Sequence, residues 1–315
     1  MKSITKKNSL NKVTHRKVAL SRGDKAFKIV TGIILAIIFA AFLYPIWFVI
    51  IASVSDPSAV NAGDVILAPK GFELAGYKRL LANPDVYVGY ANTLFYTIAG
   101  TFLNVAVTVS VAYAVSRRDL KGRTFIMMMF LFTMYFQGGL IPGYLNLRSL
   151  GLINTRWVLL TVAMINVSNM IVCRTFFASS IPWELHEAAF IDGANDFQTF
   201  FKIALPLSRP ILSVLAITYA VGHWNDYFNA MVYLKDRELY PLQLFLREIL
   251  IKSQLAAAIA EGNSAESIVS AVVEQNTASQ LKYALIVVAT VPILAIYPFF
   301  EKYFEKGFMV GSVKG

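Results

Sequence analysis

Long blocks of apolar residues, separated by short polar segments, run along most of the chain. A helix needs about 20 mostly apolar residues to cross the hydrocarbon core of a bilayer. None of the blocks alternates apolar and polar positions in the way that is typical of a membrane barrel strand. The pattern therefore predicts six transmembrane helices, at about 28–53, 89–115, 124–143, 157–178, 210–234 and 281–300.

Composition changes this picture little. Of the 315 residues, 57% are apolar and only 15% are charged, whereas about a quarter of the residues are charged in an average soluble domain. The single cysteine, Cys173, lies inside an apolar block, which excludes a disulfide framework and a Cys-based metal site. The histidines, at 15, 186 and 223, lie in different regions and indicate no metal site. We expect an all-α, polytopic membrane protein.

Lys and Arg are distributed unevenly between the loops. Loops that are rich in Lys and Arg stay on the cytoplasmic side of a membrane. With a cytoplasmic N-terminus, the loops on that side hold 19 basic and 8 acidic residues, and those on the other side hold 10 of each. The net charge of +10 is then a topology signal rather than a nucleic-acid footprint. Both termini are expected in the cytoplasm. The predicted parts are a basic tail at 1–27, a transmembrane domain at 28–300 with an external loop at 235–281 whose helices break at Gly262, and a C-terminal tail at 301–315.

The cytoplasmic loop at 181–209 carries the most informative pattern. Pro182 suits the first turn of a short helix, and Gly193 is expected to stop that helix by taking the left-handed conformation. A second short helix is predicted over Asp196–Ala204 and is expected to end at Pro206. The loop is too rich in large apolar side chains to be free. This composition indicates two amphipathic helices that lie on the membrane surface or dock on a partner.

The spacing in this loop resembles the hallmark of the membrane subunits of ATP-binding-cassette (ABC) importers. The hallmark reads Glu-Ala-Ala, three residues, Gly, nine residues, Ile, one residue, Leu-Pro. The matching residues are Glu187, Ala188, Ala189, Gly193, Ile203, Leu205 and Pro206. The segments IPWELHEAAFIDGA, WND and EKYFEKGFMVGSVKG resemble the carbohydrate-uptake, maltose-type branch. YPLQLFLREIL and EQNTASQLKYALIVVATVPIL resemble, more narrowly, a subgroup assigned to complex or acidic oligosaccharides.

The resemblance implies a binding-protein-dependent permease in the bacterial cytoplasmic (inner) membrane. Its expected partners are a second permease subunit, two ATP-binding subunits, an extracytoplasmic solute-binding protein, a sugar substrate and membrane lipid. The loop at 181–209 would be the coupling helix region that seats in a groove of the ATPase, and the external loop would reach toward the binding protein. No enzymatic activity and no cofactor are expected, because the chain has no Gly-Lys pair for a phosphate-binding loop.

Polar groups inside predicted helices are candidates for a translocation path, because they are costly in lipid unless they face a cavity or another protein group. They are Asn166, Asn169, His223, Trp224, Asn225 and Asp226. The alternative, that they join helices by hydrogen bonds, stays open. For Asn104 in the second helix this alternative is favoured. Arg174, at the cytoplasmic end of the fourth helix, is expected to reach lipid headgroups or to pair with Glu184, Glu187 or Asp192.

Two other classes of protein fit less well. A secondary transporter would need coupling-ion groups near the membrane midplane, and Asp226 alone is thin support. A membrane enzyme would need a catalytic cluster, which the sequence does not present. Co-purification of ATPase and second permease subunits with this chain would separate these classes from an importer.

Overall fold

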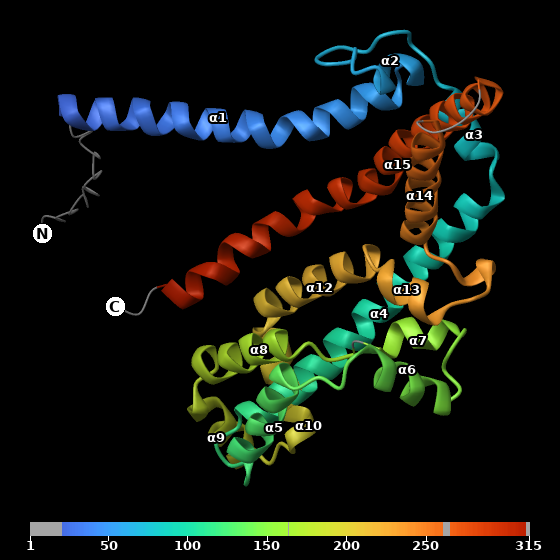
Figure 1. Cartoon of the computed structure of the whole chain (residues 1–315). Helices are drawn as coiled ribbons and strands as arrows, with labels where there is room; N and C mark the ends of the chain where they lie inside the picture. The colour runs from blue at the N-terminus through green and yellow to red at the C-terminus, as the bar shows by residue number, and fades with distance from the viewer. Residues whose placement is uncertain (1–20, 163, 261–264, 313–315) are drawn as a thin grey trace, which may run out of the picture. The chain divides into compact units, whose positions relative to one another are not determined.

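The computed structural model describes residues 21–162, 164–260 and 265–312, and every regular element within these ranges is a helix (Figure 1). The all-α prediction is confirmed. The chain divides into two units, one up to Phe48 and one from Val49 onward. Residues 1–20 of the predicted basic tail and the predicted break at Gly262 lie outside the described residues.

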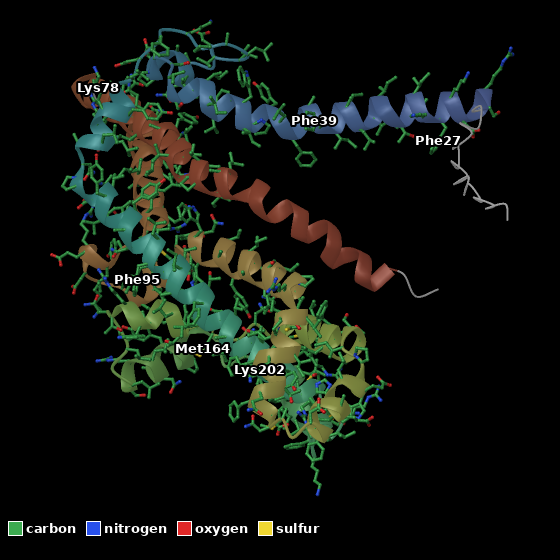
Figure 2. All side chains as sticks on the ribbon, turned by 180° about the vertical axis from the view of Figure 1, so that it is seen from behind. Phe27, Phe39, Lys78, Phe95, Met164 and Lys202 are labelled. Carbon is green, nitrogen blue, oxygen red and sulfur yellow. The ribbon has the colours of Figure 1, made fainter. Side chains whose placement is uncertain are left out.

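Helix α1 (Arg22–Ser53) contains the first predicted span and begins a few residues before it. Within the first unit its apolar side chains are exposed all round, including Phe27 (73%) and Phe39 (67%), which are labelled in Figure 2. A helix that is apolar on every side is typical of a membrane span, because lipid covers what water would reject.

The second unit holds all the other described helices. Its first half contains α2 (Pro57–Asn61), α3 (Ala75–Ala82), α4 (Pro84–Ser116), α5 (Arg123–Tyr135), α6 (Leu140–Ser149), α7 (Arg156–Thr161) and α8 (Val167–Ser180). Its second half contains α9 (Trp183–Ile191), α10 (Asp196–Thr199), the π-helix η1 (Phe200–Ala204), α11 (Leu205–Leu207), α12 (Arg209–Trp224), α13 (Phe228–Tyr233), the 3₁₀ turn η2 (Arg237–Leu239), α14 (Leu242–Ala260) and α15 (Ala265–Ser312).

Three of the described helices are long and apolar enough to cross a bilayer: α1, α4 and, within α15, residues 272–295. Two bent pairs pass the same test. Helices α5 and α6 meet at 114°, and the segment Asp196–Leu207 meets α12 at 80°. Length and composition thus allow up to five spans in the described residues, and the count of six stays a prediction.

The third, fourth and fifth predicted spans are not continuous helices, so the prediction of unbroken helices is wrong there. Gly139, between α5 and α6, has a φ of 83°, a conformation that is unfavourable for other residues. Asn166 caps α8 by accepting the Asn169 N–H at 3.1 Å. Asp226 accepts the Asn229 N–H at 3.1 Å at the start of α13. Side chains that accept a backbone N–H from the first turn of a helix favour a break just before it.

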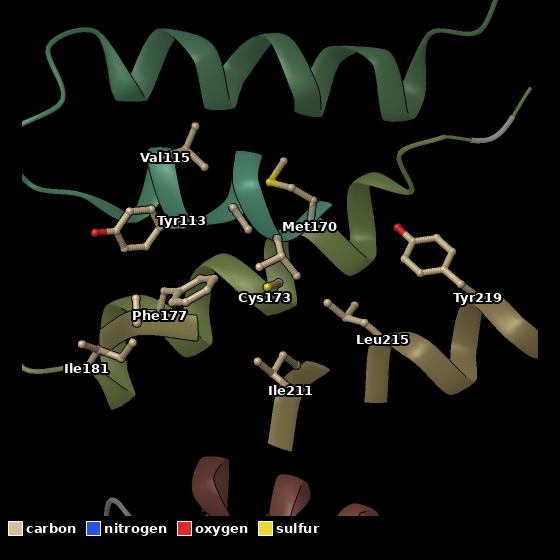
Figure 3. Packing of buried hydrophobic residues seen from close by; sticks show 12 residues of the cluster. Tyr113, Val115, Met170, Cys173, Phe177, Ile181, Ile211, Leu215 and Tyr219 are labelled. Atoms are coloured by element: carbon tan, nitrogen blue, oxygen red, sulfur yellow. The ribbon is translucent and has the colours of Figure 1, made fainter. Parts of the chain in front are cut away.

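Helix α4 runs through the centre of the second unit and contributes to three buried apolar clusters along its length, for example through Val86, Tyr96 and Val109. Figure 3 shows the last of these clusters, in which Met170 and Cys173 from α8 meet Leu215 from α12. In a bilayer, such close packing between side chains holds helices together, because lipid is as apolar as the helices themselves. This cluster supports the helices that carry the loop at 181–209.

Candidate functional site

The first half of the loop at 181–209 folds as its sequence predicts. Helix α9 begins directly after Pro182, and Gly193 lies beyond its end with a φ of 78°. The Gly193 N–H donates to the Phe190 carbonyl at 3.0 Å, and the Ala194 N–H donates to the Ala189 carbonyl at 2.9 Å. These bonds satisfy carbonyl groups that would otherwise lack a hydrogen-bond donor at the end of the helix. The left-handed conformation of Gly193 makes them possible.

The second half of the loop differs from the prediction at Pro206. Asn195 and Gln198 form a reciprocal cap that starts α10, but the helix does not end at Pro206. It passes through the π-helix η1 and continues to Leu207. A proline blocks an α-helix by clashing with the carbonyl four residues earlier. Here the backbone bond of Leu205 reaches five residues back, to Phe200, so Pro206 stands in the first turn of a new segment, where its missing N–H is tolerated.

A stack of three rings fixes α9 against the end of α4. The His186 ring lies between Trp183, at a centroid distance of 5.2 Å, and Tyr113 of α4, at 5.9 Å. Both contacts are nearly parallel. Tyr113 also contacts Phe200 of η1 at 4.9 Å. The stack therefore ties both halves of the loop to α4.

Arg117, directly after α4, adds charge to this attachment. Its guanidinium donates to Asp119 and, at 2.7 Å, to Asp196 of α10. It also lies 6.0 Å from the Trp183 ring centre. The hydrogen bond to Asp119 is the main cause that raises the pKa of Arg117, and the same bond lowers the pKa of Asp119. A charge-assisted pair of this kind orients the loop, although Asp196 is largely exposed and such pairs contribute little stability.

His186 is neutral at neutral pH. Burial and then the positive charge of Arg117 lower its pKa, while the Pro182 carbonyl, Asp119 and Asp196 act in the opposite direction. Within the described part of the chain, neither of its buried ring nitrogens has a hydrogen-bond partner of ordinary geometry. An aromatic, uncharged His186 fits the ring stack.

The hallmark residues take different positions in this fold. Ala189 is buried against the bundle, and Ile203 and Leu205 are half-buried. Glu187, Ala188, Gly193 and Pro206 are exposed. The large apolar side chains of the same loop that are most exposed are Phe190 (81%), Ile191 (82%) and Phe197 (76%). Exposed apolar side chains gathered on an anchored loop are typical of a surface that contacts another protein.

Some of the polar residues proposed for a translocation path join helices in this structure. Asn104 of α4 bonds to His223 of α12 at 2.9 Å and donates to the Met164 carbonyl at 3.0 Å. The interpretation of Asn104 as a helix-joining residue agrees with these bonds. Trp224 is buried and donates to the Ala289 carbonyl of α15 at 3.1 Å.

The remaining path candidates lie at helix ends. Asn166 caps α8 and is exposed, and Asn169 is half-buried in its first turn. Asn225 is exposed and bonds to the Val221 carbonyl at 2.9 Å. Asp226 accepts from both nitrogens of Asn229. These contacts leave Asn166 and Asn225 the most accessible of the set.

Sequence reasoning missed Tyr113, Arg117 and Asp196, which attach the loop. The signal was a charged run, Arg117-Arg118-Asp119, at the end of the second apolar block. Arg174 donates to the Val115 carbonyl at 3.4 Å. Its guanidinium has no described carboxylate within 4.0 Å, so the suggested pairs with Glu184, Glu187 or Asp192 do not form. Within the described residues, no group of three or more His, Cys, Asp or Glu side chains is placed to hold a metal ion.

A motif-bearing loop held on a bundle of apolar helices is the architecture of a transporter membrane subunit, and the comparisons with known proteins agree. Residues 86–310 match the family described as "Binding-protein-dependent transport system inner membrane component". The chain belongs to this family. It is therefore a membrane component of an ABC importer and not an enzyme, in a family that works in general with a solute-binding protein, an ATPase and a partner permease.

Two relatives from Bacillus subtilis (strain 168) are similar over most of their length. Protein LplC is 37% identical over 295 residues, which cover 94% of this chain and 97% of LplC. The polygalacturonan/rhamnogalacturonan transport system permease protein YtcP is 40% identical over 271 residues, which cover 86% of this chain and 92% of YtcP.

A solved structure shares the fold. It comes from a bacterial ABC transporter involved in the import of the acidic polysaccharide alginate. The match has a TM-score of 0.78 and 35% identity, and it covers 91% of this chain and 99% of the other.

Proposed function

We propose that the chain is a permease subunit of an importer for oligosaccharides that contain uronate units. The similarity to YtcP, whose name refers to polygalacturonan and rhamnogalacturonan, carries this proposal. The structural similarity to a component of an alginate importer supports it, because alginate is also an acidic polysaccharide. The substrate would be delivered by an extracytoplasmic solute-binding protein.

The second part of the proposal concerns energy coupling. Two ATP-binding subunits and a second permease would complete the transporter, and the loop at 181–209 would seat in a groove of one ATPase. The exposed Phe190, Ile191 and Phe197 supply the apolar contact area for that groove. Exposed Ala188 lets the partner approach closely, and the attachment of the loop to Arg117 and Tyr113 passes movement of the ATPase to α4.

The third part concerns topology. Both termini, with tails at 1–27 and 301–315, would lie in the cytoplasm, and the loop at 235–281 would face the outside and the binding protein. The charge distribution supports this orientation. The path through the membrane would pass Asn166 and Asn225, whose exposed amides can bond to sugar hydroxyls. Asn169, His223 and Asp226 would also line this path, and the buried Trp224 would support them.

Uptake of labelled substrate tests this function. A strain that lacks the chromosomal copy of this gene would be complemented with the wild-type chain, and uptake of a labelled oligogalacturonide would be compared with uptake of a neutral maltooligosaccharide. We expect uptake of the acidic sugar only. Uptake of the neutral sugar alone would contradict the substrate assignment. If the purified chain brings no ATPase subunit with it, the proposed coupling would be contradicted.

A further inference from the structure

A second feature lies beside the loop attachment and shares Arg117, Trp183 and His186 with it. A cavity of about 230 Å³ opens between the end of α4, the start of α5, the second half of α8, and α9. Its lining includes four arginines, Arg117, Arg118, Arg123 and Arg174. No Asp or Glu is among the lining residues. The cavity is therefore a strongly positive pocket beside the basic segment 117–123.

Three of these arginines have a positive charge that no carboxylate among the described residues balances. Arg117 is neutralised by Asp119 and Asp196. By contrast, among the described residues Arg123 donates only to the Arg117 carbonyl, at 3.4 Å, and Arg174 only to the Val115 carbonyl, also at 3.4 Å. In the described part of the chain, no carboxylate lies within 4.0 Å of Arg118, Arg123 or Arg174. Each guanidinium has five N–H donors in a planar fork, so most of these donors are unused.

The wall on the α9 side also has unused hydrogen-bonding capacity. His186 lines the cavity, and its two buried ring nitrogens make no hydrogen bond of ordinary geometry to the described residues. Buried polar atoms are nearly always hydrogen-bonded, so an orphaned pair calls for an explanation such as a missing ligand. The neutral imidazole carries one N–H that can donate to an oxygen anion. The rest of the wall is apolar, with Phe177, Ile181 and Trp183.

We propose that this cavity, the arginine pocket, binds a phosphate group. Guanidinium forks match the oxygens of phosphate in a bidentate way and hold phosphate better than other basic groups do. Basic pockets between membrane helices on the cytoplasmic side are suited to anionic lipid headgroups. The phosphate belongs either to a lipid diester of the membrane or to a soluble phosphate ester. A carboxylate from a partner protein is the competing occupant. A carboxylate has only two oxygens, so it would leave some of the N–H donors of Arg118, Arg123 and Arg174 without an acceptor.

A bound phosphate would bridge α9 to α4, α5 and α8, because Trp183 and His186 of α9 share the cavity with the arginines. It would therefore hold the loop at 181–209 in place. This consequence rests on the proposed coupling function, but the binding itself does not.

Binding to the purified full-length chain tests the proposal. Native mass spectrometry and thermal shift would measure the affinity for short-chain phosphatidylglycerol, inorganic phosphate, acetate and a polyglutamate peptide. The test variant is R123Q/R174Q. The matched control is R148Q, which removes an exposed arginine of α6 that is remote in sequence from the pocket. Arg174→Lys keeps the charge but loses the fork. Should the double variant not fold, Arg118→Gln at an exposed position replaces it.

We expect phosphatidylglycerol or phosphate to bind the wild type and R148Q equally, and R123Q/R174Q at least about tenfold more weakly, since charge-assisted bonds are lost. R174K should fall between them. Tighter binding of the lipid assigns the phosphate to the membrane, and tighter binding of inorganic phosphate assigns it to a soluble ester. Equal affinities in the wild type and R123Q/R174Q, or polyglutamate binding more tightly than both phosphate compounds, would overturn the proposal. This experiment does not measure sugar uptake, so failure of the phosphate proposal would leave the proposed function intact.

Discussion

Gly193 shows how one backbone conformation can serve a whole loop. Its φ of 78° is required for the turn between α9 and α10, yet no atom lies within 4 Å of the place where a Cβ would stand. A side chain at this position would meet no clash. Within this chain, a substitution therefore acts through backbone strain, and a matched pair of substitutions separates that strain from contact with a partner.

We expect Gly193→Val to reduce transport strongly while leaving membrane insertion normal. The left-handed conformation costs an ordinary residue about 1–2 kcal/mol, and a β-branched side chain suits it even less. Gly193→Asn is the matched control, because asparagine tolerates this conformation. Uptake normalised to the amount of protein in the membrane measures the effect. Equal uptake by the valine and asparagine variants would show that the turn does not depend on φ.

His186 makes the stability of the loop sensitive to acid. Its pKa is lowered in the folded protein, so the unfolded chain binds the proton more readily. The folded state thus loses stability as the pH falls below the ordinary value of 6.5 and is unaffected above it. Arg117 strengthens the effect, and Asp119 and Asp196 weaken it.

The comparison variant is His186→Phe, which keeps an aromatic ring between Trp183 and Tyr113 but does not titrate. We expect the melting temperature of the wild type to fall more steeply than that of H186F as the pH drops through about 6.5, in phosphate-free buffer. His223 is present in both proteins, so its titration cancels. Parallel curves would mean that His186 is protonated as easily in the folded chain as in the unfolded one.

At the scale of elements, the contact of α4 with α12 depends on a glycine. A Cβ on Gly100 would lie 2.4 Å from Nε2 of His223, the nitrogen that bonds to Asn104. The imidazole cannot move aside without breaking that bond. The two helices therefore approach through a small residue and a buried polar contact, which is a common solution in membranes.

We expect Gly100→Ala to destabilise the protein by about 1–3 kcal/mol, the usual cost of overpacking. Gly222→Ala is the control, since Gly222 is also helical but has open space around its Cβ position. In a His223→Ala background the Gly100→Ala change should have little further effect, because the clash is gone. Thermal unfolding of the four variants measures this. Additive losses in the double variant would place the strain elsewhere.

The same elements show what the sequence can and cannot predict. The apolar blocks located α1 and α4, and the turn at Gly193 followed from its residue type. The breaks inside the fourth and fifth blocks were missed, because Asn166 and Asp226 were interpreted only as polar groups in a membrane and not as acceptors for the first turn of a new helix. Pro206 was expected to end a helix, since a π turn before it depends on tertiary packing and not on a local pattern.

The attachment of the loop could not be predicted for a different reason. Arg117 and Asp196 are far apart in sequence, and nothing in either segment specifies the other. The charged run at Arg117 was visible, but it was counted only as a topology signal. Long-range pairs of this kind need the fold before they can be seen.

At the scale of the whole molecule, the orientation of the chain in the membrane decides whether the loop at 181–209 can meet an ATPase. Single cysteines test it in a Cys173→Ala background, since Cys173 is fully buried and its loss leaves the surface unchanged. Ala188→Cys lies on the exposed side of α9, and Leu255→Cys lies on α14 at a position that is 58% exposed. A membrane-impermeant thiol reagent would report on both positions.

We expect position 255 to be labelled in intact spheroplasts and position 188 only after the membrane is opened. The physical reason is that loops rich in Lys and Arg stay in the cytoplasm, while loops without a basic excess cross the membrane. Labelling at 188 should then fall when the ATPase subunits are bound, because their groove would cover that turn of α9. Labelling of position 188 in intact spheroplasts would place the loop on the side of the membrane where no ATPase can reach it, and both the orientation and the coupling role would have to be abandoned together.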